Sequence, residues 1–99
     1  MTVNIQYVQM ATSENMSEYV NNKLSKLGKK YDWIISATVH FQAQHDPKGK
    51  GKICKMELSL PGPRLFATSN EENYENAVKE TIRDLERQLK KRKQTYKTH

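Results

Sequence analysis

The 99-residue chain is too short for two separate hydrophobic cores and is therefore expected to form a single domain. It carries 17 Lys and Arg against 11 Asp and Glu, a balance that suits a polyphosphate partner but also an ordinary soluble basic protein. A single cysteine excludes an intrachain disulfide, and no signal-like N-terminus or run of ~20 apolar residues is present, so we expect a reducing cytoplasm and no membrane.

The N-terminal third predicts a strand followed by a helix. Residues 2–9 alternate between apolar and polar side chains, as in a half-buried strand. Thr12, Ser13 and Glu14 then supply hydroxyl caps and an acid at the positive end of a helix. That helix is expected to end near Asp32. Its apolar stripe consists of Met16, Tyr19, Val20, Leu24, Leu27 and Tyr31.

Three further strands are predicted in the middle of the chain. Residues 33–43 form the first of them, and the Pro and Gly of residues 45–51 end it in a turn that we interpret as a disordered tip. Residues 52–60 form the next strand, and residues 64–68 form a short last one after a Pro-Gly-Pro turn. The expected inward side chains are Ile35, Ala37, Val39, Phe41 and Ala43, and then Cys54, Met56, Leu58 and Leu60.

A second helix is predicted to follow, running to about Lys93. Ser69 or Asn70 is expected to cap it, with Glu71 and Glu72 in its first turn. Its buried stripe consists of Tyr74, Ala77, Val78, Thr81, Ile82, Leu85 and Leu89.

The predicted order is thus β-α-β-β-β-α, an α+β fold. The three consecutive strands pair antiparallel, whereas the strands before and after the first helix can lie parallel through a right-handed crossover. Each strand has one apolar face and each helix one apolar stripe, which favours a four-stranded mixed sheet with both helices on one face. We expect one domain over residues 1–99, with a basic tail at about 94–99.

Cations gather on the second predicted helix. From residue 76 onward the chain has eight Lys or Arg and three acids. At 100° per residue, four of these cations share a strip opposite the apolar stripe: Lys79, Arg83, Arg87 and Lys90. Pairing with Glu80 and Asp84 and the helix dipole would explain some of them as a solvated face. The consecutive cations of residues 90–93 repel one another, which favours anion binding instead.

The first predicted helix adds cations in its second half. Lys23 lies beside the apolar stripe, so its stem is expected to cover the core while its ammonium reaches the edge. Side by side, the two helices would form one broad positive surface, and the lysines of residues 48–52 would either add a third contact or belong to the tip. The predicted anion-binding residues are Lys23, Lys26, Lys30, Lys79, Arg83, Arg87, Lys90, Lys91, Arg92 and Lys93.

Chemistry-bearing motifs are missing from the sequence. His40 and His45 are not at ligand spacing and have no third ligand, so no metal is expected. Cys54 alternates with apolar residues and is interpreted as a buried small hydrophobe. No acid pair suits acid–base catalysis and no glycine loop precedes a helix, so we predict no catalytic residue, no cofactor and no enzyme. Trp33, Tyr31 and Phe41 are interpreted as core residues.

Short motifs in both predicted helices resemble a known family. The segment Leu85-Glu86-Arg87-Gln88-Leu89-Lys90-Lys91, following Pro61-Gly62 and Leu65-Phe66-Ala67, is similar to the ribosome hibernation-promoting factors. The same family includes the ribosome-associated inhibitor and proteins labelled sigma-54 modulation protein. Tyr19-Val20 and Lys23-Leu24-Ser25-Lys26-Leu27 fit its first helix, and the likeness spans essentially the whole chain.

The resemblance implies a fold like that of double-stranded-RNA-binding domains. It also implies binding between the head and body of the small ribosomal subunit, where mRNA and tRNA would lie, so that idle ribosomes are silenced. The family's RNA-contacting cations correspond to Lys23, Lys26, Arg87 and Lys91, and less closely to Lys93. The family's longer form has a C-terminal dimerisation domain that this chain lacks, so it resembles the short form.

The sequence therefore predicts a ribosome-binding translation inhibitor that contacts small-subunit rRNA, is monomeric when free and has no DNA target. Two alternatives stay open. One is a generic double-stranded-RNA-binding domain, which the same fold would suit. The other is a basic adaptor that binds an acidic protein partner.

Overall fold

Four strands form one sheet in the order β1-β2-β3-β4 in the computed structural model, which describes residues 1–97. The strands are β1 (Thr2–Tyr7), β2 (Ser36–Ala43), β3 (Lys52–Ser59) and β4 (Leu65–Glu71), and the helices are α1 (Glu14–Lys30) and α2 (Tyr74–Lys97). β1 pairs parallel with β2, and the other neighbours pair antiparallel. The predicted β-α-β-β-β-α order and mixed sheet are confirmed.

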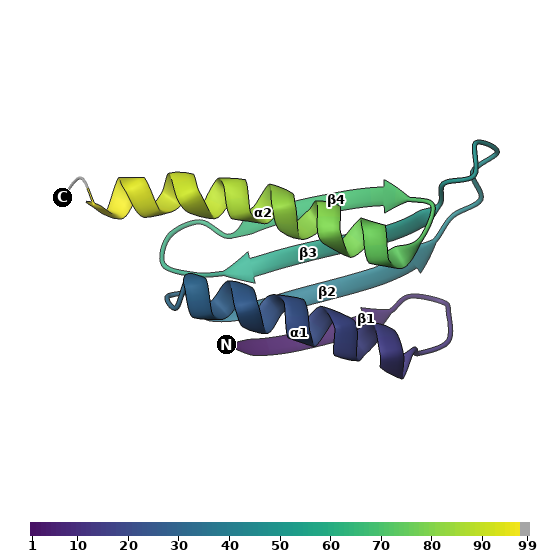
Figure 1. The fold of residues 1–99 in the computed structure, drawn as a ribbon, viewed down its shortest axis with the longest axis horizontal. Coiled ribbons are helices and arrows are strands. Elements are labelled where there is room, and N and C mark those ends of the chain that lie inside the picture. The colour runs from purple at the N-terminus through teal and green to yellow at the C-terminus, as the bar shows by residue number, and fades with distance from the viewer. Residues whose placement is uncertain (98–99) are drawn as a thin grey trace.

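Both helices cover the same face of the sheet (Figure 1). α1 crosses in front of β1 and β2, and α2 runs in front of β3 and β4. Each helix places one apolar stripe on the sheet, as the 3.6-residue periodicity predicts. The other face of the sheet carries no helix, and it presents polar side chains such as Lys55 together with the exposed ring of Phe66. Neither helix within residues 1–97 is both long and apolar enough to cross a membrane.

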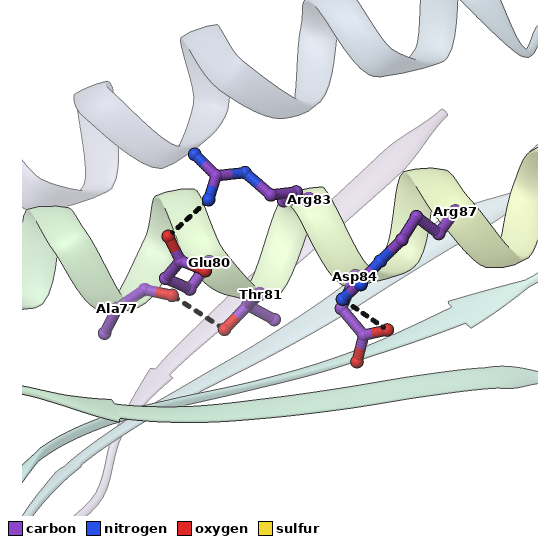
Figure 2. A network of polar contacts seen from close by, with 6 residues as sticks. All are labelled: Ala77, Glu80, Thr81, Arg83, Asp84 and Arg87. Atoms are coloured by element: carbon purple, nitrogen blue, oxygen red, sulfur yellow. Dashed lines mark hydrogen bonds and ion pairs between the residues drawn. The ribbon is translucent and has the colours of Figure 1, made fainter.

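The core lies between the sheet and the helices. Phe41 at its centre is fully buried and stacks on Tyr7 at 5.2 Å, while the ring of Tyr74 meets it edge-on at 5.5 Å. Thr81 is the one buried polar residue in the described chain, and its hydroxyl donates to the Ala77 carbonyl at 2.7 Å (Figure 2). Burial of this hydroxyl is therefore tolerated, because its hydrogen bond is made within α2.

The start of α2 differs from the prediction. β4 continues to Glu71 because its pairing with β3 extends to the Lys52 and Glu71 positions, so Ser69 and Asn70 are strand residues rather than caps. Asn73 takes the cap position, and its side-chain oxygen accepts from the Asn76 N–H at 2.8 Å.

The later start of α2 also changes which acids lie in its first turn. Glu71 and Glu72 precede α2, and Glu75 is the acid in its first turn. At the other end, the helix predicted to stop near Lys93 continues to Lys97, and residues 98–99 of the predicted tail lie outside the described residues.

The entry into β2 is a second difference. The Ile34 N–H donates to the Tyr31 carbonyl at 3.1 Å, which forms a turn that directs Ile34 into the core. Ile35, predicted to face inward, is therefore 59% exposed, because adjacent residues cannot both point to one side. Ala37, Val39 and Phe41 are buried as predicted, whereas Ala43 at the strand's end is exposed.

The loop between β2 and β3, predicted as a mobile turn, makes hydrogen bonds at its base. The Gln44 N–H donates to the Gly51 carbonyl, and the Gly51 N–H donates to the side-chain oxygen of Asn70 at 2.7 Å. Gly51 has φ +128°, and a Cβ there would lie 2.0 Å from the Gln44 carbonyl oxygen. Only glycine fits this position. The Asp46 carboxylate accepts from the Lys48 N–H.

Cys54 is fully buried, as predicted, and its burial raises the pKa of the thiol from 9.0 to about 12. Thiolate is the reactive form, so we expect native Cys54 to react with an aromatic disulfide reagent at pH 8 about a thousandfold more slowly than an ordinary thiol. Absorbance of the released thiolate measures the rate, with the denatured protein as reference. Equal rates in the native and denatured protein would contradict the burial of this thiol.

Candidate nucleic-acid interface

Cations from both helices meet along a groove between α1 and α2, here termed the interhelical groove. Two adjoining hollows make it up, with volumes of about 270 and 190 Å³, and both are lined by Lys23, Ile82 and Glu86. The first hollow adds Lys79 and Arg83 from α2. The second adds Lys26, Leu27 and Lys30 from α1. The groove therefore presents five cations above an apolar floor.

Lys23 occupies the middle of the groove. Its side chain is half-buried, and its ammonium lies 5.6 Å from the centre of the Tyr19 ring. A cation at this distance over a tyrosine is stabilised by the ring's negative face while it stays open to solvent. Lys23 also lines both hollows beside the apolar side chain of Ile82.

Two ion pairs lie along the exposed side of α2 (Figure 2). Arg83 pairs with Glu80 at 2.8 Å, and Arg87 approaches Asp84 at 3.6 Å. Both arginine side chains are about 70% exposed, at 67% and 71%, so each pair contributes at most about 1 kcal/mol. These guanidinium groups are readily available to an anion, because solvent already competes with the acids.

A second basic surface lies on the flank of α2 and is here termed the outer face. Asp84, Arg87, Gln88, Lys90 and Lys91 line a shallow hollow there of about 460 Å³. The three cations are exposed, and Lys93 is also exposed one turn further on. The outer face and the interhelical groove share no lining residue, but both are formed by the helices that cover one face of the sheet.

Lys30 and Tyr31 join the two helices through Glu86. The Glu86 carboxylate accepts from the Lys30 ammonium and from the Tyr31 hydroxyl. The Lys30 bond lowers the pKa of Glu86 and, conversely, raises the pKa of Lys30. Because the pKa of Glu86 is depressed, its contribution to stability is present above the ordinary carboxyl pKa and is lost as the pH falls through the lowered value.

Arg92 differs from the other predicted cations, because it contacts the protein itself. Its guanidinium donates to the Pro61 carbonyl at 3.1 Å, and the Tyr96 hydroxyl donates to the same oxygen. The Tyr96 ring also meets Trp33 edge-on at 5.0 Å. A Cβ on Gly62 would lie 3.0 Å from the Arg92 guanidinium. These contacts attach the end of α2 to the turn between β3 and β4.

The structure thus brings Lys23, Lys26, Lys30, Lys79 and Arg83 together in the groove. Four other predicted cations lie along the outer face and its continuation: Arg87, Lys90, Lys91 and Lys93. Glu86 was missed from the sequence, although its place between Ile82 and Lys90 at four-residue spacing puts it on the groove side of α2. Within residues 1–97 no group of three or more His, Cys, Asp or Glu is placed to hold a metal ion.

A four-stranded sheet with two helices on one face, and cations concentrated on those helices, defines a small basic α+β protein suited to polyanions. Residues 3–97 match the family described as sigma 54 modulation protein / S30EA ribosomal protein, and the chain belongs to this family. The family is not enzymatic.

Individual relatives agree with this assignment. The ribosome-associated factor Y of Haemophilus influenzae is 32% identical over 91 residues, which cover 92% of this chain and 81% of that protein. A ribosomal subunit interface protein from Coxiella burnetii has a TM-score of 0.83 at 25% identity, covering 94% of this chain and 98% of the other. The N-terminal domain of Protein Y from Thermus thermophilus has a TM-score of 0.78 at 19% identity, covering 92% and 98%, which shows a common fold.

Proposed function

We propose that this protein is a cytoplasmic, hibernation-type translation inhibitor that binds the small ribosomal subunit through rRNA phosphates. The observation that carries the proposal is the convergence of cations from α1 and α2 on one side of the molecule, in the interhelical groove and on the outer face. Membership of the family and the likeness to a ribosome-associated factor support it.

The proposed contacts with rRNA are made by exposed cations of the interhelical groove and of the outer face. Lys26, Lys79 and Arg83 reach a phosphate backbone along the groove, and Arg87 and Lys91 reach a second stretch of backbone from the outer face. Ammonium and guanidinium groups bind phosphate by charge-assisted hydrogen bonds and by releasing condensed counterions. A broad basic side, rather than a narrow slot, suits a site with rRNA on several sides.

The proposed mechanism is occlusion. The domain extends over 48 × 26 × 18 Å along its principal axes. A folded domain lodged in the decoding region excludes mRNA and tRNA by volume alone. Inhibition then needs no catalytic chemistry, and the free protein is expected to act as a monomer.

The test compares two ribosome preparations, one empty and one loaded with mRNA and initiator tRNA. Mass action requires a competing ligand to weaken binding, so we expect the loaded ribosomes to bind this protein at least about tenfold more weakly. A binding titration with labelled protein measures the difference, and adding the protein first is expected to block initiation. Equal affinity for the two preparations would contradict occlusion, even with ribosome binding itself confirmed.

A further inference from the structure

Glu86 is the only carboxylate that lines the interhelical groove within the described residues, among five cations. An acid is unfavourable beside a phosphate, so its place in a surface built for polyanions calls for a physical reason. The helix itself does not require it, because Glu80 and Asp84 already pair with the arginines of α2.

The two oxygens of Glu86 have different surroundings. Both of its hydrogen bonds, from the Lys30 ammonium and from the Tyr31 hydroxyl at 3.2 Å, go to Oε2. Oε1 has no hydrogen-bond partner in the part of the chain that the structure describes. The side chain is 27% exposed and lines both hollows, so Oε1 is an open acceptor in the groove.

Lys30 is affected by the same arrangement. Its ammonium is held by Glu86 and lies 5.8 Å from the Tyr31 ring, although its side chain is 57% exposed. A lysine paired in this way contributes less to the attraction of an arbitrary polyanion than Lys26 or Lys79, for which no acidic partner is found among the described residues.

We propose that Glu86 is a specificity-determining residue that makes the interhelical groove prefer RNA to DNA. This inference rests on the proposed function, because it concerns the same basic site. Glu86 withholds Lys30 from phosphates in general and offers Oε1 to a ribose 2′-hydroxyl, which donates a hydrogen bond. DNA has no such donor and meets only the repulsion of the carboxylate.

The variant Glu86→Gln reverses both effects with little change in shape. The amide carbonyl accepts from Lys30 and Tyr31, and the NH₂ group then faces the groove as a donor that favours phosphate. A neutral amide also holds the Lys30 ammonium more weakly than a carboxylate does. The groove therefore gains phosphate affinity and loses its acceptor for the 2′-hydroxyl.

The experiment uses RNA and DNA duplexes of one sequence, with affinity measured by fluorescence anisotropy over a range of salt. We expect the wild-type protein to prefer the RNA duplex. For Glu86→Gln, one additional effective cation should steepen the log–log salt dependence on DNA by about 0.9 and tighten DNA binding roughly five- to tenfold at 0.1 M salt. The RNA-to-DNA preference should narrow by at least about fivefold.

Two matched variants separate this effect from a change of net charge. Glu57→Gln removes the same charge and also breaks an ion pair, with Arg64 at 2.9 Å, but on the sheet face opposite the helices. It is expected to leave the RNA-to-DNA preference unchanged. Adding Lys30→Gln to Glu86→Gln should abolish the gain on DNA, because the released cation is then missing.

An unchanged preference in folded Glu86→Gln would overturn the proposal, and so would an equal narrowing in Glu57→Gln. If Glu86→Gln does not fold by circular dichroism, the double variant Glu86→Gln with Lys30→Gln provides the test, because it removes the ion pair as a unit and leaves the net charge unchanged. DNA affinity should then change less than twofold while the RNA-to-DNA preference narrows, and an unchanged preference overturns the proposal. Ribosome co-sedimentation of the wild type is scored separately: its absence contradicts the proposed function, whereas its presence with an unchanged preference contradicts only the role of Glu86.

Discussion

Arg87→Glu combined with Lys91→Glu is expected to weaken ribosome binding by about 10²- to 10⁴-fold. Both cations lie on the outer face of α2 and are exposed. A hydrogen bond to a charged group contributes about 1.5–3 kcal/mol, so losing two of them removes about 3–6 kcal/mol of binding free energy. The new acids add repulsion from phosphate. Co-sedimentation over a concentration series measures the loss.

The fold is expected to tolerate this double reversal. Among the described residues, the one ion pair it removes joins Arg87 to Asp84 at 3.6 Å, and its effect on the free energy of unfolding is within about 1 kcal/mol. The matched control is Lys48→Glu with Lys55→Glu, an equal charge change on the β2–β3 loop and on the open sheet face. We expect the control to bind nearly as wild type. If the control loses as much affinity, the contact is set by net charge rather than by α2.

Phe41→Ala is expected to lower the free energy of unfolding by about 3–5 kcal/mol, because it removes a fully buried ring that contacts Tyr7 and Tyr74. Stabilities of small domains are typically about 5–15 kcal/mol, so this variant approaches unfolding at room temperature. Urea denaturation followed by circular dichroism measures the change.

Phe66→Ala is the matched control for that measurement. It deletes the same side chain on β4, where Phe66 is 62% exposed, and its effect on the unfolding free energy is expected within about 0.5 kcal/mol. A large decrease in the unfolding free energy of Phe66→Ala would mean that this ring is covered in solution. A small decrease for Phe41→Ala would contradict the position of the core.

Local patterns were sufficient for most of the architecture. Alternation predicted the buried side chains of β3 and of the centre of β2, but not the exposure of Ile35 and Ala43. The 3.6-residue spacing predicted both helix stripes and the outward direction of the α2 cations. The start of α2 was wrong because pairing between β3 and β4 keeps Ser69 and Asn70 in a strand, although both are good helix caps. Long-range pairing therefore decided a boundary that local preference had left ambiguous.

In the candidate site, too, local patterns predicted some features and long-range contacts decided others. Its cations were predicted from helix geometry alone, but their partners were not. Lys30 meets Glu86 across 56 positions of sequence, and Arg92 meets Pro61 across 31. No periodicity relates residues so far apart, since their contact depends on how two elements pack. For that reason the sequence indicated ten similar cations, whereas the structure distinguishes exposed ones from those held by neighbours.

The attachment of α2 at its far end has a consequence for the energetics of association. Arg92 and Tyr96 both donate to the Pro61 carbonyl, and Tyr96 packs on Trp33, so the last turns of the helix are ordered before any ligand arrives. A segment that becomes helical only on binding loses conformational entropy at that moment. Here that loss has already occurred during folding. The neighbouring lysines therefore meet a polyanion with their spacing set, and more of each contact's free energy is retained as affinity.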